Sequence, residues 1–290
     1  MTDDESAARP EHHRQPVAAS AFGVVQRPLS TWERIGNVGA ARKLALLVVL
    51  ALIWEAYARW LDNPLLFPTF TATLGAFFDA IASGILPARV SRSLQVLLAG
   101  YAIGILCAAI LTVVAFSTRL GTDLLEVLTS MFNPLPAIAL LPLALIWFGL
   151  GYGSIVFVIV HSVLWAVALN AHSGFLAVSS TLRMVGRNYG LSGLSFVGQI
   201  LIPAASPSIL TGLKIGWAFA WRTLIAAELV FGVSSGSGGL GWFIYENKNQ
   251  LEIPAVFAGL FTVILIGLFV ENVVFRAIEA HTVRRWGMQS

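Results

Sequence analysis

The chain has 290 residues, of which 57% are hydrophobic and only 11% are charged, and its formal net charge is +3. Soluble domains carry about a quarter charged residues, so this composition excludes an ordinary soluble fold. A basic balance also occurs in nucleic-acid-binding proteins, but the cations here are distributed as in a membrane protein, as described below. Because most of the apolar surface cannot face water, the composition predicts a protein embedded in lipid.

The first 42 residues are polar and contain proline, histidine and mixed charge. They lack an apolar stretch followed by a cleavage site, so they are predicted to form a disordered cytoplasmic tail rather than a signal peptide. A second short cytoplasmic tail is expected at residues 277–290. The single cysteine, Cys107, falls inside an apolar run and can form no disulfide within the chain.

Apolar runs of roughly 20 residues, the length that crosses a bilayer core, recur six times between the two tails. They predict an all-α membrane protein with six transmembrane helices and both termini in the cytoplasm. The runs are Leu44–Leu61, Leu94–Phe116, Leu124–Phe148, Ser154–Val178, Ser208–Gly232 and Ala255–Phe275.

Between the first two runs, residues 65–86 are less apolar, contain Pro68 and Asp79, and are followed by Pro87. An amphipathic helix at the membrane interface is predicted there, with a partial span as the alternative. Residues 43–87 would then hold the first transmembrane helix and a periplasmic interfacial helix.

The third run contains "NPLPAIALLP" and cannot be a straight helix. Asn133, Pro134 and Pro136 are predicted to break it near its middle and to free backbone carbonyls. Broken membrane helices often mark substrate or gating regions, so these three residues are candidates for lining a translocation pathway. A simple kink for helix packing is the alternative.

The basic residues favour one side of the predicted spans, and the positive-inside rule assigns that side to the cytoplasm. The opposite side receives Arg59, Arg89, Arg92 and Lys248. The cytoplasmic side receives Arg9, Arg14, Arg27, Arg34, Arg42, Lys43, Arg119, Arg183, Arg187, Arg276, Arg284 and Arg285.

The fifth run contains "AWRTLIAAEL", which places Trp221, Arg222 and Glu228 inside an apolar helix. A charge at bilayer depth costs about 3 kcal/mol on insertion scales, so such residues usually face a polar interior. Arg222 and Glu228 are six residues apart and therefore lie on opposite faces of an ideal helix. One is expected to face the pathway and the other a neighbouring helix, with simple packing of Arg222 as the alternative. His161, in the fourth run, is interpreted as a hydrogen-bonded packing residue.

The segment "NYGLSGLSFVGQILIPAASPSILTGL", residues 188–213, interrupts the apolar pattern between the fourth and fifth runs. Before it, Ser179 or Ser180 is predicted to cap a short helix that reaches about Tyr189. Arg183 and Arg187 are four residues apart and would share one face of this helix.

Gly190 suits the position just after a helix end, where the backbone takes a positive φ. A second short segment is predicted to follow and to be broken by Pro203 and Pro207 before the fifth span. The result would be a cytoplasmic projection of two short helices joined at a glycine elbow, which is too small for an active site but suited to a groove on a soluble partner.

Two segments fit the sequence patterns of known catalytic or cofactor-binding motifs but lack the structural context that these motifs require. "GSGGLG" at residues 236–241 fits the dinucleotide-binding pattern, yet it follows a membrane span and has no strand before it. "GLSG" at residues 190–193 fits an intramembrane serine protease, yet Ser192 lies in a loop without a histidine at the same depth. Neither motif supports an enzyme, and the chain has no phosphate-binding P-loop for ATP.

The projection resembles the cytoplasmic "EAA" loop of ABC importer permeases, whose pattern is E-A-A-x-x-x-G-x(9)-I-x-L-P. Here Gly190 is followed by nine residues and then by "ILIP", which ends at Pro203. The blocks "LFPTF", "SRSLQVLLAGYAIGI", "NPLPAIALLPLALIWFGLG", "LIPAASPSILTGLKIGWAFAW", "LIAAEL" and "GGLGWFI" are similar to consecutive blocks of the nitrate/sulfonate/taurine branch of these permeases. The resemblance implies a type I permease core at residues 88–276 with its EAA loop at about 178–206.

The resemblance also implies that the EAA loop contacts an ATPase. One departure is that the glutamate of the pattern is replaced by Met184, and its two alanines by Val185 and Gly186, so a charged contact to the ATPase is missing at that position. Either Arg183 or Arg187 substitutes for it, or the loop docks by shape alone. The candidate coupling residues are Arg183, Met184, Val185, Gly186, Arg187, Gly190, Ser192, Gly193 and Pro203.

In the working cycle that the resemblance implies, two permease copies of the bacterial inner membrane, expected to be identical, form a pathway at their interface. Two cytoplasmic ATPases bind ATP and magnesium and hold the two EAA loops, while a periplasmic binding protein delivers a small anionic or zwitterionic solute. This chain itself would need no cofactor. The main alternative is a secondary transporter, which predicts an inverted repeat and paired intramembrane acids; no repeat is visible and only Glu228 lies deep.

Overall fold

A computed structural model of the chain describes residues 39–231 and 238–282, and every regular element in these ranges is a helix. Four helices are long and apolar enough to cross a membrane: Gly39–Leu61, Ile85–Ser117, Tyr152–Ala177 and Ile253–His281. Two further candidates are pairs of helices that are sharply bent at a short break. The all-helical membrane fold is confirmed, and the number of spans reaches six when each bent pair counts as one.

The chain divides into two compact units, residues 1–53 and 54–290, and all packing described below lies within the second. The first helix of the described residues, α2 (Gly39–Leu61), begins five residues before the predicted run. Most of the predicted N-terminal tail, together with residues 283–290 of the C-terminal tail and part of the "GSGGLG" motif, lies outside the described residues.

The predicted interfacial segment is shorter than expected, and the helix after it is longer. Helix α3 (Phe70–Ala82) is capped by Thr69, whose hydroxyl accepts the Ala72 N–H. Helix α4 (Ile85–Ser117) has 33 residues and starts before Pro87. Proline is tolerated in the first turn of a helix because its missing N–H would have no partner there. The helix therefore begins before Pro87 and not at Leu94, where the predicted run begins.

The third apolar run is broken where the sequence predicts it. Helix α5 (Arg119–Phe132) ends before Asn133, and the chain resumes with η2 (Ala137–Leu140) and α6 (Leu141–Phe148). The two halves are bent by 86°. Neither half alone has the roughly 20 residues that a bilayer core requires.

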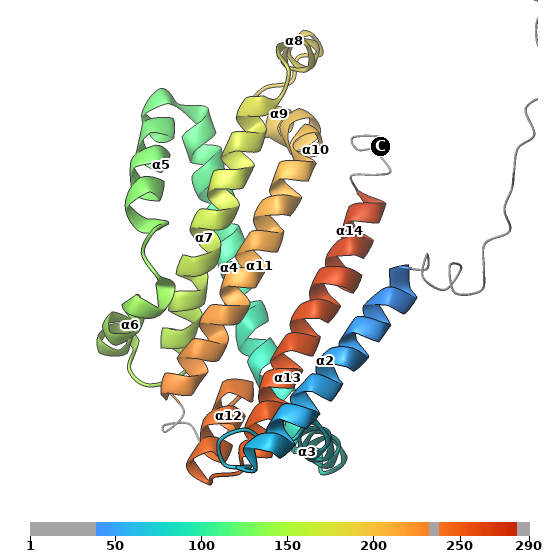
Figure 1. Cartoon of the computed structure of the whole chain (residues 1–290). Coiled ribbons are helices and arrows are strands. Elements are labelled where there is room, and N and C mark those ends of the chain that lie inside the picture. Colours follow the sequence, from blue (N-terminus) through green and yellow to red (C-terminus); the bar gives the residue numbers. More distant parts are fainter. Residues whose placement is uncertain (1–38, 232–237, 283–290) are drawn as a thin grey trace, which may run out of the picture. The chain divides into compact units, whose positions relative to one another are not determined.

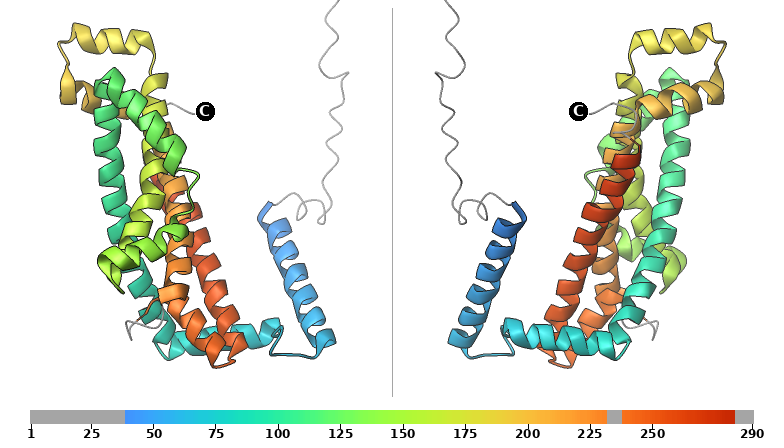
Figure 2. Two further views of the ribbon diagram at one scale, coloured as in Figure 1. Left: turned by 90° about the vertical axis from the view of Figure 1, so that its left-hand side faces the viewer. Right: turned by 90° about the vertical axis from the view of Figure 1, so that its right-hand side faces the viewer.

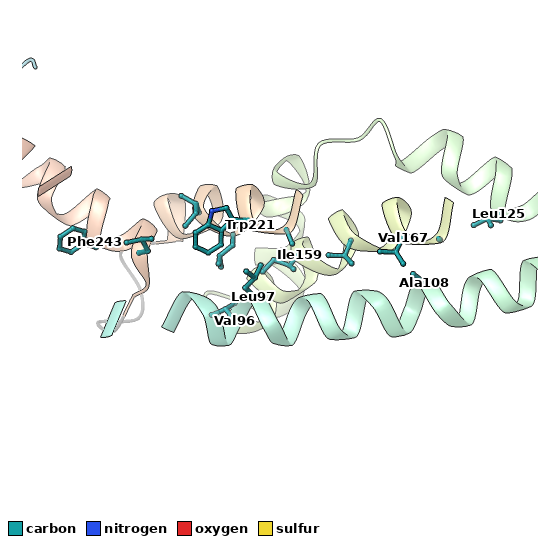
Figure 3. Close-up of a cluster of buried hydrophobic side chains, with 14 of the residues drawn as sticks. Val96, Leu97, Ala108, Leu125, Ile159, Val167, Trp221 and Phe243 are labelled. Carbon is teal, nitrogen blue, oxygen red and sulfur yellow. The ribbon is translucent and has the colours of Figure 1, made fainter. Parts of the chain in front are cut away.

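Helix α7 (Tyr152–Ala177) packs on both α4 and α11 (Ser206–Phe231) in Figure 1. Glycines allow this close approach: a Cβ on Gly100 would lie 2.7 Å from the Ile159 side chain, and one on Gly104 would lie 2.7 Å from the Val163 side chain. Small residues four apart are the usual means by which membrane helices bring their backbones together. Figure 3 shows the resulting apolar core, in which Leu97, Ile159 and Val167 are buried.

Replacing Gly104 by valine is therefore expected to destabilise the fold by about 1–3 kcal/mol, because the added atoms overlap Val163 in a packed core. Thermal unfolding of the purified protein in detergent should show a lower midpoint. Gly75→Val is the matched control, because nothing lies within 4 Å of a Cβ added at that helical glycine. Equal midpoints for the two variants would contradict the close contact between α4 and α7.

The last span is a single continuous helix that extends beyond the predicted run. It comprises α13 (Ile253–Phe269), a wider π-helical turn η4 (Val270–Phe275) and α14 (Arg276–His281). The first residues of the predicted C-terminal tail, 277–281, are therefore helical rather than part of a tail. Before this span, the short helix α12 (Leu240–Asn249) follows α11.

A different short helix lies at each end of α11. The projection that contains α8 (Ser180–Asn188) precedes its N-terminus, and α12 follows its C-terminus, so the two short helices lie at opposite ends of α11 in Figure 1 and Figure 2. With 26 residues, α11 is about 39 Å long, enough to cross a bilayer core of about 30 Å.

Candidate translocation and coupling sites

The glycine elbow forms as predicted. The Ser179 hydroxyl accepts the Leu182 N–H at 3.3 Å and so caps α8. Gly190 has a φ of +75°, and the N–H of Leu191 donates to the carbonyl of Gly186 at 3.1 Å. The Gly190 N–H donates to the carbonyl of Arg187 at 2.9 Å. These two bonds make a Schellman motif, the helix end that favours glycine at this position.

After the elbow, the chain is broken before the fifth span as predicted, because residues 193–204 and α11 meet at a bend of 78° between Pro203 and Pro207. Residues 193–204 form a bent helical stretch that includes Pro203, and the turn into α11 occurs at Ala205. A π-helical turn, η3 (Val197–Leu201), precedes Pro203, and its wider hydrogen-bond spacing accommodates a residue without an N–H. Pro207 lies in the first turn of α11, where proline is tolerated.

Arg183 ties α8 to the end of α7. Its guanidinium donates to the carbonyls of Phe175 at 2.7 Å, Leu176 at 3.0 Å and Val178 at 3.1 Å, and it lies over the Phe116 ring. The last carbonyls of a helix have no partner within it, and a cation there also complements the helix dipole. Arg183 is thus held within the fold and is poorly placed to substitute for the glutamate of the EAA pattern.

The outer surface of the projection carries several exposed apolar side chains among polar ones. Met184, Val185, Tyr189 and Leu194 are exposed, with Tyr189 at 82%. Among the remaining candidate coupling residues, Arg187, Gly190, Ser192 and Gly193 are also exposed, while Pro203 is half-buried. Gly186 is buried, and a Cβ there would lie 2.9 Å from the side chains of Phe196 and Ile200. The absence of a side chain at Gly186 therefore lets α8 pack against the helical stretch that follows the elbow.

A cavity of about 330 Å³ opens at the break in the third apolar run. Four of the predicted pathway residues line this cavity. Asn133, Pro134 and Pro136 come from the break between α5 and η2, and Arg222 comes from α11. The other lining residues are Phe132, Leu135, Ala137, Ile138, His161, Ser162, Trp165, Phe219, Thr223 and Ala226.

Among the described residues, Arg222 is the only charged one that lines this cavity. Its side chain is exposed, and its guanidinium carbon lies 6.0 Å from the centre of the Phe219 ring. Within the described residues, Arg222 forms no hydrogen bond and no ion pair, so the charge is available to an incoming group.

The other two predicted pathway residues lie apart from this cavity. Trp221 is buried and donates through Nε1 to the Val263 carbonyl at 3.3 Å. It borders a second cavity, of about 270 Å³, between α11 and the last span. Glu228 is 5% exposed and lines neither cavity. The sequence argument that Arg222 and Glu228 point in different directions agrees with these positions.

Glu228 holds the N-terminus of α12. The Ser93 hydroxyl lies 2.8 Å from both carboxylate oxygens, and the Gly241 N–H donates to Oε2 at 2.8 Å. The Leu240 N–H in turn donates to the Ser93 oxygen at 2.7 Å. A carboxylate at a helix N-terminus satisfies N–H groups that lack partners within the helix and complements its dipole. The role of Glu228 in the structure is therefore to anchor α12.

Arg89 reinforces the same junction. Its guanidinium donates to the Gly238 carbonyl at 2.8 Å and to Glu246 Oε2 at 3.0 Å, so it holds both the approach to α12 and its last turns. From the sequence, Arg89 was predicted only as a charge on one side of the membrane, and Ser93 was not predicted to have a role. The partner of Glu228 in α4, Ser93, is 135 residues away in the chain, and no local pattern links the two.

The interpretation of His161 as a hydrogen-bonded residue is wrong for the described part of the protein, although its packing role is supported. Its ring lies 6.3 Å from Phe132 and 6.1 Å from Trp165, yet neither ring nitrogen has a hydrogen-bond partner. Sequence reasoning also missed Phe132 and Trp165 as cavity residues. The four-residue spacing of His161 and Trp165, which puts both on one helix face, was the available signal.

The helices, the cavity at a broken span and the external elbow define a multi-pass membrane protein. The chain belongs to the family described as binding-protein-dependent transport system inner membrane component, whose model matches residues 100–286, more than half of the chain. This match and the named relatives confirm the resemblance to type I ABC importer permeases of the nitrate, sulfonate and taurine branch.

Three relatives illustrate the similarity. A putative ABC transporter permease protein of Methanocaldococcus jannaschii is 30% identical over 79% of this chain and 86% of its own length. The taurine transport system permease protein of Escherichia coli is 29% identical over 78% of this chain and 82% of its own. The nitrate import permease protein of a Synechocystis species is 27% identical over 94% of each chain.

Proposed function

We propose that this chain forms the translocation pathway of an ATP-driven importer for a small anionic or zwitterionic solute. The observation that carries the proposal is the cavity at the broken span, where Arg222 offers a charge without a partner among the described residues. A cation at bilayer depth is unfavourable unless it faces a polar interior or a ligand, so its presence here supports a pathway for anions. The names of the taurine and nitrate permeases agree with such a solute.

The partners follow from the family. We propose two copies of this chain, cytoplasmic ATPase chains that bind ATP and magnesium, and a periplasmic binding protein. The exposed surface of α8 and the elbow would fit into a groove of the ATPase. Because Met184, Tyr189 and Leu194 are exposed and Arg183 is held by α7, this contact would rest on apolar packing, with Arg187 contributing charge at its edge.

The proposed orientation in the inner membrane places the elbow in the cytoplasm and α12 in the periplasm. In a Cys107→Ser background, cysteines at Ser192 and Gln250, both exposed, should be labelled by an impermeant maleimide from opposite sides. Ser192→Cys should react only in inverted vesicles and Gln250→Cys only in intact spheroplasts. Labelling of both from the same side would contradict the orientation.

Gly190→Val is expected to lower solute-stimulated ATP hydrolysis at least fivefold, because a positive φ costs a side chain with a Cβ about 1–2 kcal/mol and valine would distort the elbow. No atom lies within 4 Å of an added Cβ, so the effect would come from the backbone and not from a clash. Gly190→Asn is the matched control, since asparagine tolerates this conformation. Normal coupling in the valine variant would show that the elbow geometry is dispensable.

The experiment that tests the proposed function is ATP hydrolysis by the complex that co-purifies with this chain, reconstituted in lipid with its binding protein. Taurine, alkanesulfonates and nitrate are added one at a time. Stimulation by at least one anion supports an importer. Solute uptake that proceeds without ATP and follows an ion gradient would instead establish the alternative, a secondary transporter.

A further inference from the structure

The walls of the cavity at the broken span are largely flat and apolar. Phe132 and Trp165 are stacked, with ring centres 5.4 Å apart and an interplanar angle of 11°. Pro134, Pro136 and Phe219 extend this lining on the sides formed by the break and by α11. An inorganic oxyanion such as nitrate has no apolar surface to bury against such walls, whereas an aromatic ring gains from packing on flat aromatic faces.

The same cavity contains buried nitrogen atoms without hydrogen-bond partners. Trp165 is only 8% exposed, and its Nε1–H has no acceptor within the described residues. Both ring nitrogens of His161, one helical turn earlier on α7, also lack partners there. Buried polar groups in folded proteins are nearly always paired, so groups left unpaired beside a cavity indicate that a ligand or water completes them.

Three further polar side chains line the cavity, those of Asn133, Ser162 and Thr223, and the Ser162 hydroxyl is paired within its own helix, where it donates to the Ile159 carbonyl at 2.8 Å. Arg222 supplies the charge, and Trp165 with His161 supplies hydrogen bonds, inside a lining that is otherwise mainly apolar. The combination suits a solute with one anionic head and a flat apolar body.

We infer that the permease itself contains a selectivity subsite for an organic anion in which a sulfonate or carboxylate head is joined to an aromatic body. The head binds the Arg222 guanidinium, with the Trp165 Nε1–H or a His161 nitrogen as a further donor. The body packs against the Phe132–Trp165 stack and the two prolines of the break. The inference rests on the proposed function for its place in a transport pathway, but the subsite can be measured without transport.

The test is equilibrium binding by calorimetry to the purified permease in lipid nanodiscs, without ATPase or binding protein. Benzenesulfonate, methanesulfonate and nitrate are the probes, with benzyl alcohol as the uncharged aromatic control. Benzenesulfonate is expected to bind at least about tenfold more tightly than nitrate or benzyl alcohol, because only it uses both the charge and the apolar walls. Equal affinity for nitrate, or no binding of benzenesulfonate, would overturn the inference.

Three variants assign the binding to this cavity. Arg222→Gln should weaken benzenesulfonate binding about tenfold or more, since it removes a charge-assisted hydrogen bond. Trp165→Phe keeps a flat ring but removes the N–H, and should weaken binding by about threefold to tenfold. Arg119→Gln, at an exposed arginine on α5, should leave the affinity unchanged. Unchanged affinity in Arg222→Gln would overturn the inference, and thermal unfolding checks that each variant is folded.

The outcomes also separate the subsite from the proposed function. Specific binding of benzenesulfonate without any anion-stimulated ATP hydrolysis would retain the subsite and contradict the importer. ATP-driven import with no preference for an aromatic anion, either in binding or in uptake, would retain the importer and contradict the subsite.

Discussion

Glu228→Ala should destabilise the folded protein by roughly 3 kcal/mol, because it leaves the Ser93 hydroxyl and the Gly241 N–H buried without their acceptor. The anchor of α12 to the end of α11 and to α4 would be lost with it. Thermal unfolding in detergent, followed by size-exclusion chromatography, should show a lower midpoint and a smaller folded fraction. Glu228→Gln retains one acceptor oxygen and should lie between the wild type and the alanine variant.

A matched control is Glu246→Gln, at the half-exposed carboxylate that pairs with Arg89. Exposed and partly exposed ion pairs contribute about 0–1 kcal/mol, so this variant should unfold close to the wild type. If Glu228→Ala and Glu246→Gln have the same stability, Glu228 does not anchor α12, and its proposed place as a pathway residue would need to be considered again.

Arg222→Gln should reduce solute uptake about tenfold or more while leaving the complex with the ATPase intact. The variant keeps much of the side-chain length but removes the charge that would attract an anion, and charge-assisted hydrogen bonds contribute about 1.5–3 kcal/mol. The proposed ATPase contacts lie on the projection around α8, which precedes the N-terminus of α11, whereas Arg222 lies within α11. Uptake and co-purification of the ATPase are measured on the same preparation.

Arg222→Lys provides the control for charge alone. Lysine restores the positive charge but not the planar fork of the guanidinium, so uptake should recover only in part. Normal uptake in Arg222→Gln would make this arginine a packing residue. Loss of the ATPase from both variants would point to a structural role of Arg222 between helices.

The features that the sequence predicted are those set by local chemistry. Gly190 was identified because a helix end with positive φ favours glycine whatever surrounds it, and the structure shows that conformation. Asn133, Pro134 and Pro136 were identified because prolines interrupt a helix without any tertiary contact. Their position beside Arg222 could not be derived, since it depends on how α7 and α11 bring the break and the charge together.

The features that the sequence missed depend on pairing across long distances. Arg183 looked like a surface charge because its acceptors are the last carbonyls of α7, which are available only once the chain turns back at Ser179. Glu228 looked like a pathway residue because a buried acid is usually functional, yet Ser93 and the start of α12 satisfy it. The length of α4 was underestimated because the predicted run was limited to the apolar stretch from Leu94, whereas the helix also includes the polar residues before it.

The most direct test of the central proposal is accumulation of a labelled anion in proteoliposomes that contain this chain with its co-purifying ATPase, with the binding protein and solute on the periplasmic side. ATP and magnesium are supplied only on the side of the elbow. We expect the anion to accumulate against its gradient with ATP and not to accumulate without ATP, and we expect Arg222→Gln to reduce accumulation about tenfold or more. Accumulation that ignores ATP and follows a proton or sodium gradient, with Arg222→Gln as active as the wild type, would contradict the proposal.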